Sequence, residues 1–135
     1  MTNQHRQKEI MADKYEFPYH YLPSLAADHW QLHRQLNWGF EYIGYLSEVI
    51  DMVESNSQGR SILDIGCGDG RLVNELATRG FGPITGIDID ERAIAFANAF
   101  KSDAPGNDVT FQCGDSNSLM KSDYQVITLM EVIEH

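Results

Sequence analysis

A glycine-rich turn between two apolar segments is the feature that most limits how this 135-residue chain can fold. Three glycines alternate with a cysteine and an aspartate at positions 66–70, directly after the apolar run at 61–65. Glycine adopts positive φ without steric cost and lets another group approach the backbone closely. Residues 71–79 then carry apolar side chains at helical spacing, and Gly80 is a suitable helix stop. The pattern predicts a strand, a tight ligand-binding loop and a helix.

Strand and helix patterns continue to alternate after this turn. Further strands are predicted at 84–88, 109–113 and 124–130, and a further helix at 91–100. Asp90 can cap that helix, and Ile94, Ala97 and Phe100 are expected to pack inward. This alternation is typical of an α/β fold with a Rossmann-like parallel sheet and right-handed crossovers. Ligands of such sheets bind at the carboxyl ends of the strands.

The N-terminal part has a different character, because nine of the 14 aromatic residues lie between Tyr15 and Tyr45. We expect a disordered tail over residues 1–14, a cap of aromatic arm and helix over 15–58, and an α/β domain over 59–135. The predicted helix runs from about residue 36 to residue 53 and ends before Gly59. Its apolar face consists of residues three and four positions apart: Phe40, Ile43, Leu46, Val49, Ile50 and Val53.

Charge and composition exclude several classes of protein. The formal net charge is −10 at pH 7, which is unsuited to binding nucleic acid or anionic lipid. No apolar run approaches the roughly 20 residues of a membrane span, and the first 14 residues are too polar for a signal peptide. We therefore expect a cytoplasmic protein. Two cysteines are too few for a disulfide framework.

The glycine-rich loop is unsuited to a dinucleotide. A pyrophosphate at this helix start would meet Asp64 and Asp69, and Arg71 stands where the dinucleotide fingerprint has glycine or alanine. Asp88 ends the second predicted strand at nearly the spacing of an acid that binds ribose hydroxyls. Asp115 follows the third and offers an acceptor for an adenine amino group. Together these residues indicate a site for a nucleoside with a cationic tail that lacks phosphate.

Residues 61–135 resemble the class I S-adenosylmethionine-dependent methyltransferases. Residues 63–70 look like the first motif of that family, residues 86–90 like its ribose-binding second strand, and residues 114–115 like its adenine-contacting segment. Residues 131–135 are similar to the segment after strand four in the ubiquinone-biosynthesis and small-RNA 2′-O-methyltransferase branches. Because three more strands follow in the resembled fold, we expect a domain truncated after its fourth strand. Self-association through the exposed sheet edge would then follow.

The resemblance implies S-adenosyl-L-methionine as the cofactor and a role for each matching residue. Asp64 would orient the loop or reach the amino group, Asp88 would bind both ribose hydroxyls, and Asp115 would accept from adenine. The other implied cofactor contacts are Gly66, Cys67, Gly68, Ile89 and Ser116. Each aspartate also has a structural alternative: a turn cap at Asp64, a solvated strand end at Asp88 and a turn former at Asp115. Asp88 is expected to face solvent in the empty site, so that its removal changes stability little.

Three residues at the end of the chain are candidates for general base catalysis: Glu131, Glu134 and His135. They resemble metal ligands of the RNA-methylating branch, but we expect no tightly held metal. The predicted function is methyl transfer to a small molecule, lipid or sugar precursor. Three alternatives stay open: a cofactor-binding domain without turnover, an RNA 2′-O-methyltransferase-like enzyme and a nucleotide-dependent dehydrogenase fragment.

Overall fold

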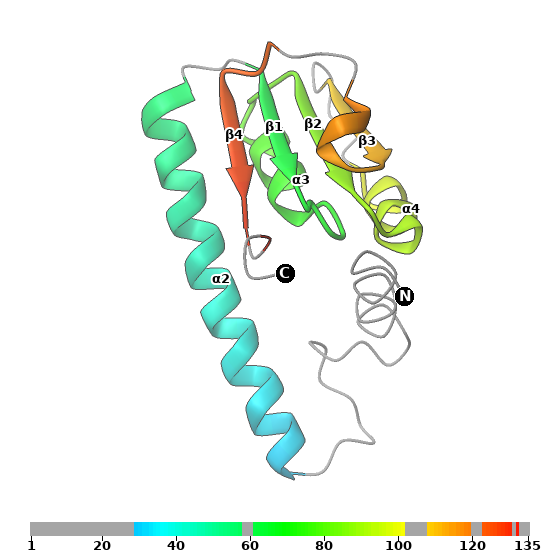
Figure 1. Cartoon of the computed structure of the whole chain (residues 1–135). Coiled ribbons are helices and arrows are strands. Elements are labelled where there is room, and N and C mark those ends of the chain that lie inside the picture. Colours follow the sequence, from blue (N-terminus) through cyan, green and yellow to red (C-terminus); the bar gives the residue numbers. More distant parts are fainter. Residues whose placement is uncertain (1–28, 58–60, 102–107, 120–122, 131, 133–135) are drawn as a thin grey trace. The chain divides into compact units, whose positions relative to one another are not determined.

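The structure is a computed structural model that describes residues 29–57, 61–101, 108–119, 123–130 and 132. Its elements in chain order are α2 (His29–Ser57), β1 (Ile62–Ile65), α3 (Arg71–Thr78), β2 (Ile84–Asp88), α4 (Glu91–Ala99), β3 (Val109–Cys113), the short 3-10 helix η1 (Ser116–Ser118) and β4 (Val126–Leu129) (Figure 1). The chain divides into two compact units, residues 1–51 and 52–135, with the boundary inside α2. The tail and aromatic arm lie outside the described residues.

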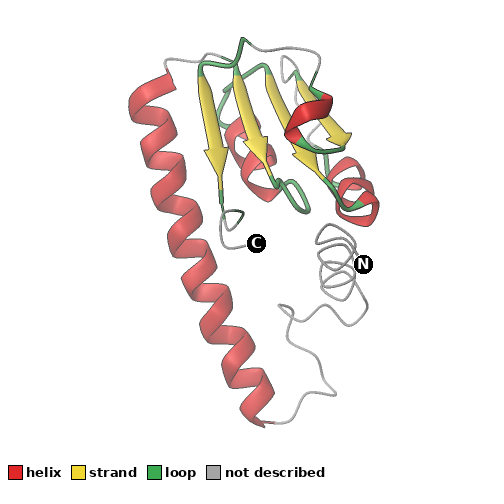
Figure 2. Ribbon diagram, viewed as in Figure 1, coloured by secondary structure: helices red, strands yellow, loops and turns green. Residues whose placement is uncertain are grey.

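The second unit is built on a parallel sheet with the strand order β3-β2-β1-β4 (Figure 2). All three strand pairings are parallel, and Ile62 of β1 lies opposite Ile84 of β2 and Val126 of β4. The predicted α/β class, strand positions and parallel sheet are therefore confirmed. Since β1 and β2 are central, their ends have neighbouring strands on both sides.

Helix α3 forms and ends as its sequence predicts. Its inward face consists of the buried residues Leu72, Val73, Leu76 and Ala77. Gly80 has a φ of +85° and its N–H donates to the Ala77 carbonyl at 3.0 Å, while the Phe81 N–H donates to the Leu76 carbonyl at 3.1 Å. These two bonds are the Schellman ending of a helix, in which glycine takes the left-handed position.

Helix α4 begins as predicted but ends one residue early. An oxygen of the Asp90 side chain accepts from the Arg92 N–H at 2.8 Å, which confirms the predicted cap. Its buried residues are Ala93, Ile94 and Ala97. The inward packing expected for Phe100 is wrong, because this residue is 71% exposed. Phe100 is the C-cap, where the backbone has already left helical geometry, so the helical spacing no longer sets its direction.

Helix α2 is longer than predicted, and its apolar face is only partly buried. It continues through the Ser-Asn-Ser run, where the Asn56 side chain donates to the Met52 carbonyl one turn earlier. Ile50 and Val53 are buried, whereas Phe40 is 72% exposed. Helical spacing correctly predicted the helix, but only the end nearer its C-terminus is covered among the described residues.

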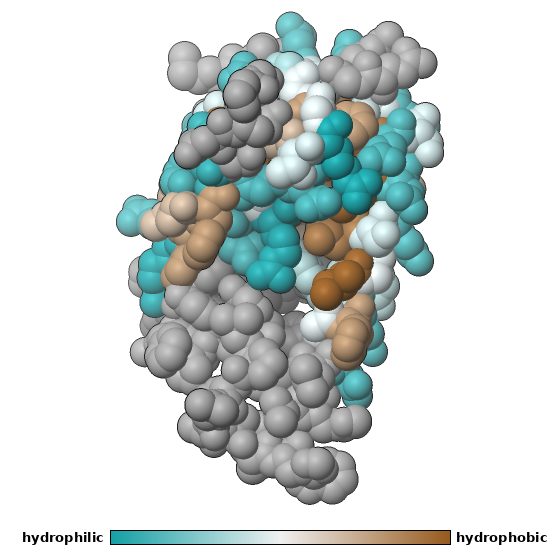
Figure 3. Space-filling model, turned by 180° about the vertical axis from the view of Figure 1, so that it is seen from behind, coloured by the Kyte–Doolittle hydropathy of each residue, from teal (hydrophilic) through white to brown (hydrophobic). Residues whose placement is uncertain are grey.

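Strand β4 lies at one edge of the described sheet, and its apolar Ile127 and Leu129 are exposed. This edge is the basis of the expected self-association, which stays a prediction. On the face seen in Figure 3, hydrophobic residues form separate patches among hydrophilic ones. Among the described helices, none combines the length and apolar character needed to cross a bilayer.

Candidate functional site

The loop between β1 and α3 depends on glycine at its turning points. Gly66, Gly68 and Gly70 have φ angles of +74°, +54° and +75°, which confirms the predicted backbone. A Cβ atom at Gly66 would collide with the Val132 side chain, and one at Gly70 would lie 2.6 Å from the ring of Phe111. At Gly66 and Gly70, the positive φ and the close neighbouring side chains therefore both exclude larger residues.

Most N–H groups of this loop donate to acceptors within the protein. The bonds run from Gly66 N and Cys67 N to Ile87 O at 2.8 and 2.9 Å, from Gly68 N to Asp88 Oδ2 at 2.9 Å, and from Gly70 N to Cys67 O at 2.9 Å. A phosphate-binding loop, in contrast, aims such N–H groups at its ligand. The loop is therefore poorly equipped to bind a pyrophosphate, for a reason that the sequence pattern did not show.

Asp88, at the end of β2, holds the loop to the start of α4. Its Oδ2 accepts from the Gly68 N–H and its Oδ1 from the Asp90 N–H, both at 2.9 Å. The residue is only 4% exposed, so the expected solvent-facing carboxylate is wrong. Burial raises the pKa of Asp88, and hydrogen bonds from the backbone N–H groups of Asp90, Gly68 and Ile89 oppose that rise. A carboxylate has about four lone-pair sites, so about one stays available after these three backbone donors.

Asp64, inside β1, is 3% exposed and bonds across the sheet. Its Oδ1 accepts from the hydroxyl of Thr128 at 2.7 Å, and the two residues are register partners on β1 and β4. Burial, with a smaller contribution from the charge of Asp88, raises the pKa of Asp64 to about 7, while the Thr128 bond opposes the rise. Thr128 could not be predicted from the sequence, since only the pairing of β1 with β4 places it beside Asp64.

Cys67 fills space in the loop. It is buried, and a Cβ atom at Gly86 would lie 3.0 Å from its sulfur. Burial, followed by the charges of Asp64 and Asp88, raises the pKa of the Cys67 thiol, which keeps it protonated. These features agree with a small structural residue, while its expected cofactor contact is untested.

Asp115 forms a turn at the end of β3. Its Oδ1 accepts from the N–H groups of Asn117 and Ser118 at 3.0 and 3.2 Å, which begins η1. In the structure, Asp115 therefore forms a turn, as its structural alternative predicted. The N–H of the preceding Gly114 donates to the Asp88 carbonyl at 2.9 Å. This bond joins the β3 loop to the end of β2, so a ligand at one loop lies near the other.

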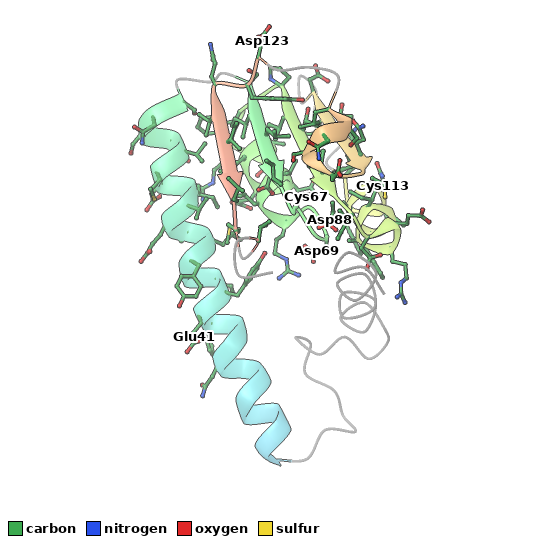
Figure 4. The ribbon with its side chains drawn as sticks, in the orientation of Figure 1. Glu41, Cys67, Asp69, Asp88, Cys113 and Asp123 are labelled. Atoms are coloured by element: carbon green, nitrogen blue, oxygen red, sulfur yellow. The ribbon has the colours of Figure 1, made fainter. Side chains whose placement is uncertain are left out.

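The remaining predicted residues lie around the same strand ends. Figure 4 shows Cys67, Asp69 and Asp88 close together at the ends of β1 and β2, with Cys113 at the neighbouring end of β3. The Cys113 sulfur lies 3.8 Å from the carbonyl oxygen of the half-buried Ile89. Ser116 is exposed at the start of η1. The structure therefore gathers the loop, Ile89 and the β3 turn into one region.

Asp69 and Arg71 form an ion pair at the entrance to α3. The guanidinium nitrogen and the carboxylate oxygen are 2.9 Å apart, and both side chains are partly exposed. Arg71 therefore offsets the charge of Asp69. Asp69 was predicted as an acid that a pyrophosphate would meet, and its pairing with Arg71 was not predicted.

The three candidate catalytic residues Glu131, Glu134 and His135 lie outside the described residues. Their roles as general bases stay predictions, and so does the expectation that they hold no metal tightly. Across the part of the chain that the structure describes, no cluster of three or more His, Cys, Asp or Glu side chains is arranged for metal binding.

Comparison with known proteins agrees with this geometry. The family model described as "Methyltransferase domain" matches residues 56–135, more than half of the chain. The chain therefore belongs to this methyltransferase family, and its fold is that of the class I S-adenosylmethionine-dependent enzymes, as the resemblance implied.

Two relatives are ubiquinone biosynthesis O-methyltransferases. The protein from Nitrosomonas europaea is 33% identical over 104 residues, which cover 75% of this chain and 39% of the relative. The protein from Coxiella burnetii is 36% identical over 80 residues, which cover 58% of this chain and 33% of the relative. The chain thus spans little more than a third of the length of the curated relatives it matches.

A solved structure extends the likeness in fold. Magnesium protoporphyrin IX methyltransferase from Synechocystis PCC 6803, crystallised with S-adenosylmethionine, has a TM-score of 0.73 and 20% sequence identity. The alignment covers 98% of this chain and 63% of that protein. At this identity the likeness concerns the fold alone.

Proposed function

We propose that residues 56–135 bind S-adenosyl-L-methionine at the carboxyl ends of β1, β2 and β3, and that the protein transfers its methyl group to a small molecule, lipid or sugar precursor. The observation that carries this proposal is the glycine-rich loop, which lies against two buried carboxylates and uses most of its N–H groups internally. Such a loop suits a cationic ligand better than a phosphate.

The chemistry of the cofactor fits the residues present. S-adenosylmethionine carries a sulfonium, an ammonium, a ribose diol and an adenine, and it has no phosphate. Asp64 and Asp88 are buried carboxyl groups beside the loop, and each supplies negative charge there when it is ionised. We propose that the remaining acceptor capacity of Asp88 serves the ribose hydroxyls. Asp115 uses one oxygen for two turn N–H groups, and its second oxygen, which accepts a long 3.5 Å bond from the Asn117 side-chain amide, is our candidate acceptor for the adenine amino group.

The transfer step asks little covalent chemistry of the protein. When bound, S-adenosylmethionine supplies a methyl group that its sulfonium already makes electrophilic. The protein must align an acceptor with that group, which contributes up to about 7–11 kcal/mol in well-aligned reactions. The relatives are named O-methyltransferases, so we propose an oxygen acceptor. Such an acceptor benefits from a general base, and Glu131, Glu134 and His135 are the candidates.

Calorimetry with S-adenosylhomocysteine and NAD tests the cofactor proposal. We expect measurable binding of S-adenosylhomocysteine and at least tenfold weaker binding of NAD, because the loop offers its pyrophosphate few N–H donors. Tighter binding of NAD would favour the dehydrogenase alternative. Release of S-adenosylhomocysteine in the presence of phenolic or other hydroxyl acceptors then distinguishes an enzyme from a cofactor-binding domain without turnover.

A further inference from the structure

A buried hydroxyl group bridges two acceptors beside the proposed cofactor site. The Oγ1 atom of Thr128 lies 2.7 Å from Oδ1 of Asp64 and 3.4 Å from the carbonyl oxygen of Leu63. Asp64 and Thr128 are both buried, on adjacent strands β1 and β4. A hydroxyl has one proton to donate, so it can serve only one of these acceptors at a time.

This geometry satisfies Asp64 in either protonation state. When Asp64 is ionised, the Thr128 hydroxyl donates to the carboxylate at the shorter distance. When Asp64 is protonated, its O–H donates to Thr128 Oγ1, and the threonine proton turns to the Leu63 carbonyl. Neither arrangement leaves the buried carboxyl without a partner, which matters because an unpaired buried polar group is costly.

We propose that Thr128 is a positioning residue that holds Asp64 in both states and makes cofactor binding proton-linked. This inference rests on the proposed function: the ammonium of the amino-acid part of the cofactor is complementary to the ionised carboxylate alone. Binding at a protonated Asp64 therefore breaks its O–H bond, leaves the electron pair on the carboxylate and releases the proton to solvent.

The surroundings of Asp64 bring this proton exchange close to neutral pH. The titratable groups that face it among the described residues are Asp88 and Cys67. Burial and the charge of Asp88 favour the protonated form, and the Thr128 hydroxyl favours the ionised form, with a resulting pKa of about 7. The Cys67 thiol stays neutral in this range, because its own pKa is raised.

Titration of the ligand-free protein tests the role of Thr128 directly. We would follow the Asp64 carboxyl carbon by NMR between pH 5 and 9 in the wild type, Thr128→Val and Thr128→Ser. Valine removes the hydroxyl and keeps the shape, so the Asp64 midpoint should rise by about one pH unit, a tenfold change in the protonation equilibrium. Serine restores the hydroxyl and should keep the wild-type midpoint. An unchanged midpoint in Thr128→Val would overturn the proposal.

Ligand binding tests the proton linkage. The affinity for S-adenosylhomocysteine should rise about tenfold per pH unit below the Asp64 midpoint and level off above it. Calorimetry in buffers of different ionisation enthalpy should show proton release over the same range. The affinity for methylthioadenosine, which lacks the amino-acid part, should stay constant. Asp64→Asn cannot ionise and should abolish the pH dependence, which makes it an independent variant if Thr128→Val fails to fold.

The outcomes separate the two proposals. If both ligands bind and neither affinity depends on pH, the proton linkage is wrong and the cofactor proposal stands. A slope that persists in Asp64→Asn would also overturn the linkage. If neither ligand binds at any pH, the cofactor proposal fails and the linkage fails with it, whereas the ligand-free titration still decides whether Thr128 controls Asp64.

Discussion

Aspartate has different roles on the two central strands of the described sheet and on β3 at its edge. Asp64 and Asp88 lie in or after β1 and β2 and are almost fully buried, with pKa values raised by that burial. Asp115 follows β3, is only partly buried, and forms a local turn. An aspartate near a strand end is thus a different chemical group depending on how many neighbouring elements cover it.

The largest expected effect is on stability at Asp64. It tests whether burial on a central strand changes the chemistry of an aspartate. The folded pKa of Asp64, about 7, lies above its ordinary value of 3.8. The carboxyl therefore contributes most stability below about pH 3.8, and this contribution is lost as the pH rises toward 7. Asp64→Asn avoids the burial of a charge and should raise the free energy of unfolding by about 2–4 kcal/mol at pH 8, and by much less at pH 4.

Urea unfolding across this pH range measures the effect. Asp69→Asn removes a carboxyl group that is partly exposed, and it serves as the matched control. Equal unfolding free energies for wild type and Asp64→Asn at both pH values would show that burial of the Asp64 charge does not destabilise the fold.

The second effect, at Asp88, corrects the expectation of little change in stability. Asp88→Ala leaves the half-buried N–H of Gly68 and the buried N–H of Asp90 without their acceptor, so the free energy of unfolding should fall by about 1–3 kcal/mol. Loss of the proposed ribose contacts should weaken binding of S-adenosylhomocysteine by about 10- to 100-fold. Thermal unfolding and calorimetry measure the two effects. A variant of wild-type stability and affinity would remove Asp88 from both roles.

Asp115→Ala tests the partly buried aspartate that follows β3. Loss of the two turn N–H bonds should lower the free energy of unfolding by about 1 kcal/mol, as for other capping residues. The affinity for S-adenosylhomocysteine should fall by less than about tenfold, the equivalent of 1.4 kcal/mol, because its carboxylate is partly solvated. If this variant lost more affinity than Asp88→Ala, the ranking by burial would be wrong.

The smallest effect is expected at Asp69, where the carboxylate is partly exposed and paired with Arg71. Exposed ion pairs contribute about 0–1 kcal/mol, so Asp69→Asn should change the unfolding free energy by less than about 1 kcal/mol. The change should decrease further at 1 M salt, where such charges are screened. A larger change that salt does not reduce would show that Asp69 acts within the buried cluster.

Local features of this protein could be predicted from its sequence. The left-handed turns at Gly66, Gly68 and Gly70, the helix stop at Gly80 and the cap at Asp90 were all confirmed. Each depends on the backbone preference of one residue and on bonds within a few positions of it. The class of fold followed from the same local patterns, since alternating strands and helices favour a parallel sheet.

The chemical state of the site was decided only by the tertiary structure. The exposed Phe100, the buried Asp88 and the bond from Thr128 to Asp64 could not be inferred from spacing along the chain. Thr128 lies 64 positions from Asp64, and only the order of the strands makes them neighbours. The spacing of residues along the chain reflects their local backbone preferences. The pKa of a carboxyl, in contrast, depends on how many atoms from other elements replace the water around it.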